Sequence, residues 1–196
     1  TFFPVGKLAI GYPEILKRVA DAGHTVGSHT WSHRNMASKK TTTKRATDEI
    51  EDAISAVKLA LGKPGAPFFR YPYLKDTPET IKYLASRNIA VFSTDLDSFD
   101  FKGGRPSKLV ARVMRNLKKR GKGILLFHDI QRVTARAMPQ LLAQLKKGGY
   151  KIVHLTAKAP VTTLPAYDAK IAKNLRGSSS MAQRPISSVV ETVKEN

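Results

Sequence analysis

Apolar residues recur three or four positions apart in five stretches of this chain, and this spacing marks one buried face of an α-helix. The second stretch has Ile50, Ala53, Ile54, Val57 and Leu61 in register. Proline in a first turn and glycine after a last turn mark several of the ends. The spacing predicts helices near residues 13–22, 47–61, 78–85, 107–120 and 134–147.

Short runs rich in β-branched and aromatic residues separate these helices and predict strands. The runs are 25–27, 67–69, 89–94, 123–127 and 150–155, and the run over 89–94 is expected to be buried. The polar, basic stretch 34–46 is expected to be a loop. Alternating strands and helices predict an α/β fold with a parallel sheet, either open or closed into a barrel. In both forms, functional residues gather at the carboxyl ends of the strands.

The two ends of the chain differ in character from its middle. Residues 159–196 are rich in proline, glycine and serine, so we expect a C-terminal tail or extension after a domain over 1–158. The opening Thr1-Phe2-Phe3 has the pattern of a strand interior, so we expect a preceding segment in the natural sequence. No apolar run is long enough for a transmembrane helix. The absence of cysteine excludes disulfides and thiolate metal ligands.

Two histidines four residues apart follow the first predicted strand. If the chain turns helical there, His29 and His33 lie on one face and can share a divalent metal ion such as Zn²⁺. The alternative is a pair of surface histidines at the start of a loop. A catalytic zinc ion takes about three protein ligands. Asp95, Asp97 and Asp100 follow another strand and could supply a carboxylate, or could belong to a solvated loop.

Two further strand ends carry candidate catalytic side chains. His128 follows an apolar run and could be a general acid or base, or could cap the strand. Arg70 precedes a turn stiffened by Pro72 and could orient a carboxylate beside an oxyanion site, although a surface arginine explains that motif taken alone. His24 and His154 are interpreted as structural histidines.

Taken in order, these segments resemble the NodB-homology polysaccharide deacetylases, carbohydrate esterase family four. Residues 29–33, 70–73, 97–100 and 126–128 match the motifs His-[Ser/Thr]-x-x-His, Arg-x-Pro-Tyr, Asp-x-x-Asp and Leu-x-His of that family. Phe101 stands where the family has Trp, and Leu74 stands where it commonly has Gly. The resemblance runs from residue 1 to about residue 155 and implies a distorted (β/α) barrel whose first strand lies upstream of this chain.

The resemblance also implies a metal centre that this chain holds only in part. His29 and His33 would be two of its ligands, with Zn²⁺ as the expected ion. The third ligand and the general base would both be aspartates of a Thr-Phe-Asp-Asp motif upstream of Thr1. As given, the chain is therefore expected to lack its catalytic base.

The remaining matched residues would complete the chemistry. The resemblance implies that Arg70 and Asp100 pair to tune the base, and that His128 is the general acid that protonates the leaving amine. The backbone N–H of Tyr73 would help to hold the oxyanion. The pocket for the acetyl methyl group would be lined by Leu126 and Phe101.

The resulting expectation is a metal-dependent hydrolase that removes N-acetyl groups from a GlcNAc-containing polysaccharide, either chitin oligomers or peptidoglycan. The alternatives are an O-acetyl esterase acting on xylan, a non-catalytic glycan-binding module of the same fold, and a basic nucleic-acid-binding domain. The resemblance implies a secreted, periplasmic or cell-envelope location.

The charge of the chain bears on these alternatives. Its 34 lysines and arginines exceed its 15 aspartates and glutamates by 19, which predicts attraction to polyanions. The sequence has no recognition-helix or RNA-binding signature, and its basic residues are spread over helix ends and loops. An anionic cell-wall polymer is therefore the expected partner beside the acetylated glycan, and nucleic acid is not favoured.

Overall fold

The structure is a computed structural model that describes residues 1–176, and these residues fall into two units. The first unit comprises residues 1–93 and 154–176, and the second comprises residues 94–153. None of the described helices is long and apolar enough to cross a membrane.

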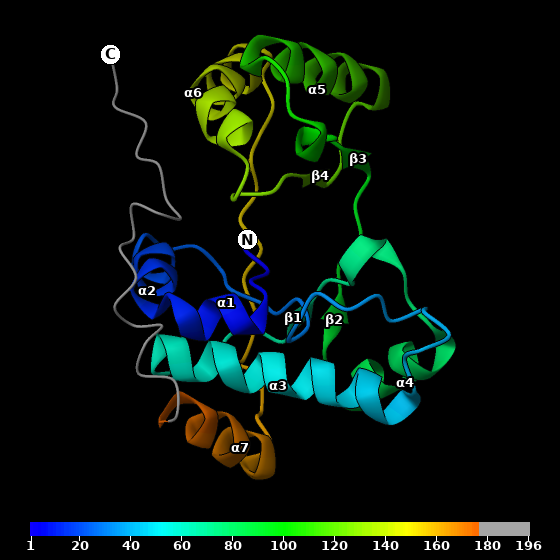
Figure 1. Cartoon of the computed structure of the whole chain (residues 1–196). Coiled ribbons are helices and arrows are strands. Elements are labelled where there is room, and N and C mark those ends of the chain that lie inside the picture. The colour runs from blue at the N-terminus through cyan, green and yellow to red at the C-terminus, as the bar shows by residue number, and fades with distance from the viewer. Residues whose placement is uncertain (177–196) are drawn as a thin grey trace. The chain divides into compact units, whose positions relative to one another are not determined.

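The first unit is built around α3 (Thr43–Leu61), its longest helix. The helices α1 (Gly6–Gly11) and α2 (Pro13–Asp21) contact α3 on one side, and α7 (Pro165–Arg176) contacts it on the opposite side (Figure 1). A further helix, α4 (Pro78–Ser86), contacts α3 as well. The apolar face of α3 supplies Ile50, Ile54 and Val57 to the core of this unit.

Four short extended segments of the first unit run parallel to one another. The strands β1 (Phe68–Phe69) and β2 (Ala90–Val91) form a parallel pair. Single bridges join Phe2 to Val26 and Ser28 to Phe69, so the segment order is residue 2, residues 26–28, β1 and β2. Gly27 is required there, since a Cβ at this position would lie 2.5 Å from the carbonyl oxygen of Phe68.

The second unit has one parallel strand pair and two long helices. β3 (Leu96–Asp97) pairs with β4 (Leu125–Leu126), and α5 (Pro106–Arg120) connects them. α6 (Arg132–Lys147) follows β4 and packs against α5 (Figure 1). Leu109, Val110, Val113, Ala137 and Leu141 form the core between these two helices. Two short 3-10 segments, η1 (Pro72–Leu74) in the first unit and η2 (Asp100–Lys102) in the second, follow strand ends.

The five predicted helices are confirmed, with shifts at their ends. The expected loop 34–46 is shorter than predicted, because Thr42 caps α3 by accepting a hydrogen bond from the Arg45 N–H and the helix begins at Thr43. α4 begins as expected, with Thr77 and Thr80 forming a capping box. α1 was not predicted, because its two glycines and six-residue length leave little periodicity to detect.

Two predictions about strands were wrong. Residues 150–155 form no strand, because no other described segment makes a β-ladder with them, and a strand requires a partner for its backbone groups. The run over 89–94 pairs as predicted, but Ala90 and Val91 are exposed rather than buried, because β2 is the last segment in its row.

The C-terminal region contains more structure than its composition indicated. Val161 is buried in the core of the first unit, and its N–H donates to the carbonyl of Gly65. α7 then packs along α3, although it lies within the expected tail 159–196. The remainder of that expected tail, residues 177–196, lies outside the described residues.

Candidate active site

The candidate site residues of the first unit lie at the carboxyl ends of its parallel segments. His29 follows the segment 26–28 and Arg70 follows β1. The Arg70 N–H donates to the carbonyl of Ser28 over 3.1 Å, which joins these two strand ends directly. His29 and Arg70 therefore lie at the edge where functional residues are expected, and their roles remain predictions.

The imidazole of His29 is held in one tautomer by the backbone. Its Nδ1 lies 2.7 Å from the carbonyl oxygen of Arg70. Because a carbonyl can only accept a hydrogen bond, Nδ1 carries the proton, and in the neutral ring Nε2 carries the lone pair. Metal-binding histidines have this arrangement, with the second ring nitrogen donating to a carbonyl or a carboxylate.

Three rings lie next to one another in this unit. The rings of His29 and His33 meet edge to face with their centroids 4.9 Å apart. The ring of Tyr73 also meets the ring of His33 edge to face, with centroids 4.9 Å apart. The structure therefore brings together the two predicted metal ligands and one side of the predicted oxyanion turn.

The segment that carries the two histidines is not the helical turn considered from their spacing. Residues 29–33 form no helix, and both Thr30 and His33 adopt left-handed backbone conformations, with φ of 62° and 60°. Such conformations cost free energy for residues other than glycine, so the surrounding contacts must hold them in place. The histidine rings are adjacent because of this folded loop and not because of helical periodicity.

Arg70 ties three strand ends together through its guanidinium group. Nε donates to the carbonyl of Phe92 over 3.1 Å and Nη2 donates to the carbonyl of Ser93 over 3.0 Å. The same group lies over the ring of Phe3, 4.6 Å from its centroid. Burial lowers the pKa of Arg70. The usual pKa of a guanidinium group is so high that Arg70 stays charged. Its positive charge is thus fixed at the carboxyl edge.

The turn after Arg70 has a strained backbone. Tyr73 has φ of 59° and Leu74 has φ of 55°, both in the left-handed region. Leu74 takes the position where glycine is common in the family that the sequence resembles, and a glycine would adopt this conformation without strain. The Tyr73 side chain is exposed. Its predicted role as the oxyanion donor remains a prediction.

In the second unit, the buried Asp100 pairs with the partly exposed imidazole of His128. Asp100 is fully buried and accepts three hydrogen bonds, from His128 Nδ1 at 2.7 Å, the His128 backbone N–H at 2.6 Å and Thr134 Oγ1 at 2.6 Å. The predicted pair of Arg70 with Asp100 joins residues of different units and remains a prediction. Thr134 was missed from the sequence, because a threonine near a helix start carries no chemical signal of its own.

The Asp100–His128 pair changes the pKa of both partners. Burial raises the pKa of Asp100, but the hydrogen bonds from His128 and Thr134 outweigh burial and leave it lowered. The hydrogen bond to Asp100 raises the pKa of His128 above its ordinary value, against the smaller effect of desolvation. The pair therefore favours a protonated imidazole held by an ionised carboxylate, which suits a general acid.

One apolar ring contacts this imidazole, and a buried leucine lies two residues before it in the chain. The ring of Phe101 meets the ring of His128 edge to face at 5.9 Å and is half exposed. Leu126 is buried in β4, and its carbonyl accepts a hydrogen bond from the Ser98 N–H. These two residues thus lie on the elements that position His128, as a pocket wall requires. The pocket itself remains a prediction.

The other acidic and imidazole groups considered have structural partners. Asp95 accepts hydrogen bonds from Arg120 and from the Ile124 N–H, and Asp97 accepts one from the Phe99 N–H at 2.8 Å. His154 lies 2.8 Å from the Thr25 hydroxyl, which fits the structural role expected for it. Within residues 1–176, no group of three or more His, Asp or Glu side chains could hold a metal ion. His29 and His33 nevertheless fit two imidazole ligands, because of the His29 tautomer and the adjacent rings.

The chain is similar in sequence to polysaccharide deacetylases. A family model for polysaccharide deacetylase matches residues 1–92. The peptidoglycan-N-acetylglucosamine deacetylase of Bacillus cereus is 29% identical over 162 residues, which cover 79% of this chain and 56% of the relative. Chitin deacetylase 1 of Saccharomyces cerevisiae is 31% identical over 139 residues, which cover 68% of this chain and 45% of the relative. This chain therefore spans about half the length of these two relatives.

Solved structures extend the similarity across both units. The peptidoglycan deacetylase Bd3279 of Bdellovibrio bacteriovorus has a TM-score of 0.73 and 38% identity over 81% of this chain and 44% of its own. A CE4 family pseudoenzyme from Bacillus anthracis has a TM-score of 0.71 and 25% identity over 79% of this chain and 53% of its own. A structure described as T48 deacetylase with substrate has a TM-score of 0.67 and 32% identity over 78% of this chain and 73% of its own. The chain therefore belongs to the polysaccharide deacetylases of carbohydrate esterase family 4 and has their α/β fold of the NodB type.

Proposed function

We propose that this protein removes N-acetyl groups from a GlcNAc-containing polysaccharide in a metal-dependent hydrolysis that releases acetate. The observation that carries the proposal is the Asp100–His128 pair. An amide is cleaved only when its leaving nitrogen is protonated, and the hydrogen bond to Asp100 raises the pKa of His128 and so favours its protonated form. In an ester the leaving group is an alkoxide oxygen, which is less basic than the leaving nitrogen of an amide and needs a proton less. The pair therefore supports N-deacetylation over xylan O-deacetylation.

Each side chain of the first unit has a role in this proposal. His29 and His33 would hold the metal ion through imidazole nitrogens, with Zn²⁺ as the ion that such ligands favour. When bound, this ion polarises the acetamide carbonyl and lowers the pKa of water. The Tyr73 N–H would donate to the carbonyl oxygen as it gains charge, and Arg70 would orient the carboxylate that acts as the base. We assign the base and the third ligand to no residue in 1–176.

The second unit would deliver the proton and receive the acetyl group. His128 would donate its proton to the leaving nitrogen, and Asp100 would stabilise the imidazolium before that transfer. Leu126 and Phe101 would form the apolar wall against which the acetyl methyl group packs. The peptidoglycan and chitin named for the relatives are the leading substrates. A substrate of this kind would support a location at the cell envelope.

Metal analysis tests the first half of the proposal. The purified protein is expected to retain a divalent metal, and the double variant His29→Ala/His33→Ala is expected to lose it, because the two imidazoles supply the ligands. A His24→Ala variant is the matched control, since His24 contacts Phe2 and not the candidate site. Equal metal content in the protein and the double variant would overturn the metal role.

Acetate release tests the second half. With the protein at its natural length, His128→Ala is expected to reduce turnover on chitin oligomers or peptidoglycan by about 10²–10⁴-fold, the usual contribution of a general acid. Its metal content should stay unchanged. Loss of the metal in this variant would make His128 a ligand and its assigned role wrong. Faster release from acetylxylan than from either glycan would favour the esterase.

A non-catalytic glycan-binding module is the second candidate. One of the similar solved structures is described as a pseudoenzyme of this family. The lack of a three-ligand cluster within residues 1–176 is the observation that favours it here. Glycan binding without acetate release, at natural length and with added Zn²⁺, would support the module over the enzyme.

A further inference from the structure

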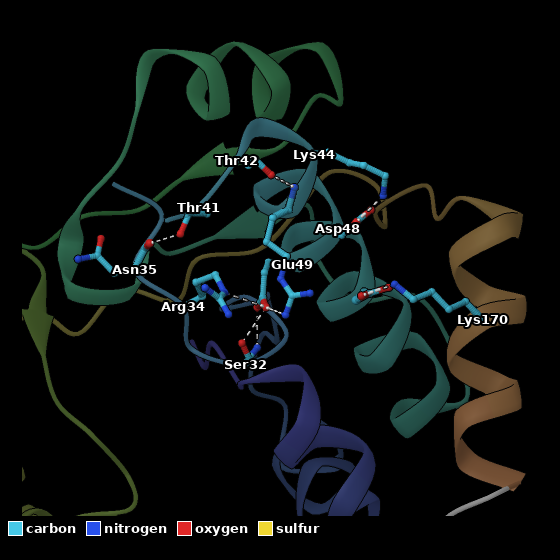
Figure 2. Close-up of polar contacts among 11 residues, drawn as sticks. Ser32, Arg34, Asn35, Thr41, Thr42, Lys44, Asp48, Glu49 and Lys170 are labelled. Carbon is cyan, nitrogen blue, oxygen red and sulfur yellow. Dashed lines mark hydrogen bonds and ion pairs between the residues drawn. The ribbon is translucent and has the colours of Figure 1, made fainter. Parts of the chain in front are cut away.

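Glu49 is a fully buried carboxylate that contacts the loop between the two candidate metal ligands. It lies on α3 with 1% of its surface exposed. Its Oε2 accepts the Ser32 N–H over 2.7 Å, and its Oε1 accepts the Ser32 hydroxyl over 2.7 Å (Figure 2). Both oxygens of the side chain are thus directed at Ser32, the residue next to His33.

The backbone of Glu49 holds the same loop at the preceding residue. The Trp31 N–H donates to the carbonyl of Glu49 over 2.8 Å. From the other side, the N–H groups of Gly6 and Lys7 donate to the carbonyls of Thr30 and Trp31. Every residue between His29 and His33 is therefore tied to α3 or to the start of α1.

Two arginines balance the buried charge of Glu49. Arg34 Nε lies 3.6 Å from Oε1 (Figure 2). Arg45 Nη2 lies 3.4 Å from the same oxygen. A buried carboxylate is tolerated only when it is paired and hydrogen-bonded, and Glu49 is both. Arg34 follows His33 directly, so the ion pair holds the loop on the far side of that histidine as well.

These contacts explain how a strained loop is maintained. Thr30 and His33 hold left-handed conformations that a free loop of these residues would leave. We propose that Glu49 is a positioning residue for the His29–His33 pair, acting through Ser32 and Trp31 to fix the approach of the two imidazoles. This inference rests on the proposed role of the histidines as metal ligands.

The chain offers a matched control for this residue. Glu51 also lies on α3, is also fully buried and also pairs with an arginine, since it accepts from Arg87 Nε at 2.8 Å and from the Tyr83 hydroxyl at 2.7 Å. Its side chain bonds the C-terminal part of α4 and not the histidine loop. Glu49→Gln and Glu51→Gln each remove one buried negative charge and keep the side-chain shape.

The experiment measures zinc affinity and amide hydrogen exchange in both variants. A glutamine at position 49 has one acceptor oxygen for two Ser32 donors and turns an NH₂ group toward the arginines, so the loop should loosen. We expect Glu49→Gln to lower Zn²⁺ affinity about tenfold or more, as is usual for groups that orient a ligand. Ser32 amide exchange should accelerate more than global unfolding explains, and Glu51→Gln should change neither reading.

Ser32→Ala tests the same contact from the side of the loop. Ser32→Ala removes one donor from a partly exposed residue, and we expect it to weaken zinc binding in the same direction if Glu49→Gln does not fold. Equal losses in Glu49→Gln and Glu51→Gln, or unchanged Ser32 exchange in Glu49→Gln, would overturn the positioning role. If the unaltered protein binds no Zn²⁺, the proposed metal centre fails, and the exchange data alone decide whether Glu49 positions the loop.

Discussion

Asp100 is the residue on which the chemistry assigned to His128 depends. Its carboxylate fixes the His128 ring by accepting from Nδ1, and it fixes the backbone of the same residue by accepting from its N–H. One carboxylate thus sets the position, tautomer and protonation of the imidazole. A conservative substitution of such a side chain removes its charge and leaves its shape, so the effect can be assigned to the charge.

We predict that Asp100→Asn lowers the pKa of His128 toward the ordinary value of about 6.5. The sign follows from the raised pKa: the protonated form is stabilised in the fold, so its contribution is present at low pH and is lost as pH rises through the folded pKa. The alkaline limb of the pH–activity profile should move to lower pH. Nuclear magnetic resonance titration of the His128 ring measures the shift directly, with Asp95→Asn as the control. An unchanged pKa in Asp100→Asn would contradict the assignment.

Thr134 is predicted to stabilise the second unit through the hydrogen bond to Asp100. Thr134→Val keeps the side-chain shape and removes the hydroxyl, so a buried carboxylate loses one of its three donors. Hydrogen bonds to charged groups contribute about 1.5–3 kcal/mol, and the free energy of unfolding should fall by a similar amount. Urea denaturation measures the loss. Thr134→Ser retains a hydroxyl and should recover most of the stability, so equal values for the two variants would show that the bond contributes little.

At the scale of elements, local patterns predicted helices well and pairings poorly. Apolar spacing located α2 to α6, because burying one helical face depends on residues close in sequence. The segment 150–155 has a strand composition but lacks a described partner, and pairing is decided by residues far away in the chain. α7 was hidden by the proline and serine content around it, although its packing against α3 is extensive.

For the candidate site too, residues with a local signal were predicted, and contacts between residues far apart in the chain were not. Its motif residues His29, Arg70 and His128 were identified because imidazole and guanidinium groups beside strand ends carry chemical information. Glu49 was missed because an acid in a charged helix is typical of a solvated face. Its position three residues after Ala46 and four before Ala53, both buried, is the signal that could have found it. Its loop partner Ser32 could not be inferred from spacing.

α7 is predicted to be part of the folded first unit. Ile171 is fully buried, and three polar pairs join α7 to α3, namely Asp168 with Lys58, Tyr167 with Asp48 and Lys170 with Asp52. Ile171→Ala should therefore lower the free energy of unfolding by about 2–5 kcal/mol, the usual cost of such a cavity. Thermal or urea denaturation gives the value, and Lys173→Ala at an exposed position is the control. A loss no larger than that of Lys173→Ala would mean that α7 is dispensable.

For the whole molecule, charge is the property that the site does not explain. Residues 94–153 contain 14 lysines and arginines against four aspartates and no glutamate, so this unit carries a large share of the net charge of +19. Lys118, Lys119 and Arg120 lie exposed in the last turn of α5, and exposed Lys122 follows them. Cations at a helix C-terminus interact favourably with the helix dipole, so the fold accommodates this cluster readily. A protein that approaches an anionic wall polymer gains encounter rate from such a field.

We predict salt-dependent binding of a soluble phosphodiester wall polymer, such as a teichoic acid, through this end of α5. Every phosphate that the protein no longer neutralises should reduce the slope of log affinity against log salt concentration by about 0.7–0.9, the range known for nucleic acids. The triple variant Lys118→Ala/Lys119→Ala/Lys122→Ala should therefore lower the slope by about two. A control triple variant, Lys7→Ala/Lys17→Ala/Arg18→Ala, removes the same charge from exposed positions of the first unit and should lower it less. Equal reductions would mean a diffuse attraction without a preferred surface, and tighter binding of duplex DNA than of the wall polymer would favour the nucleic-acid alternative.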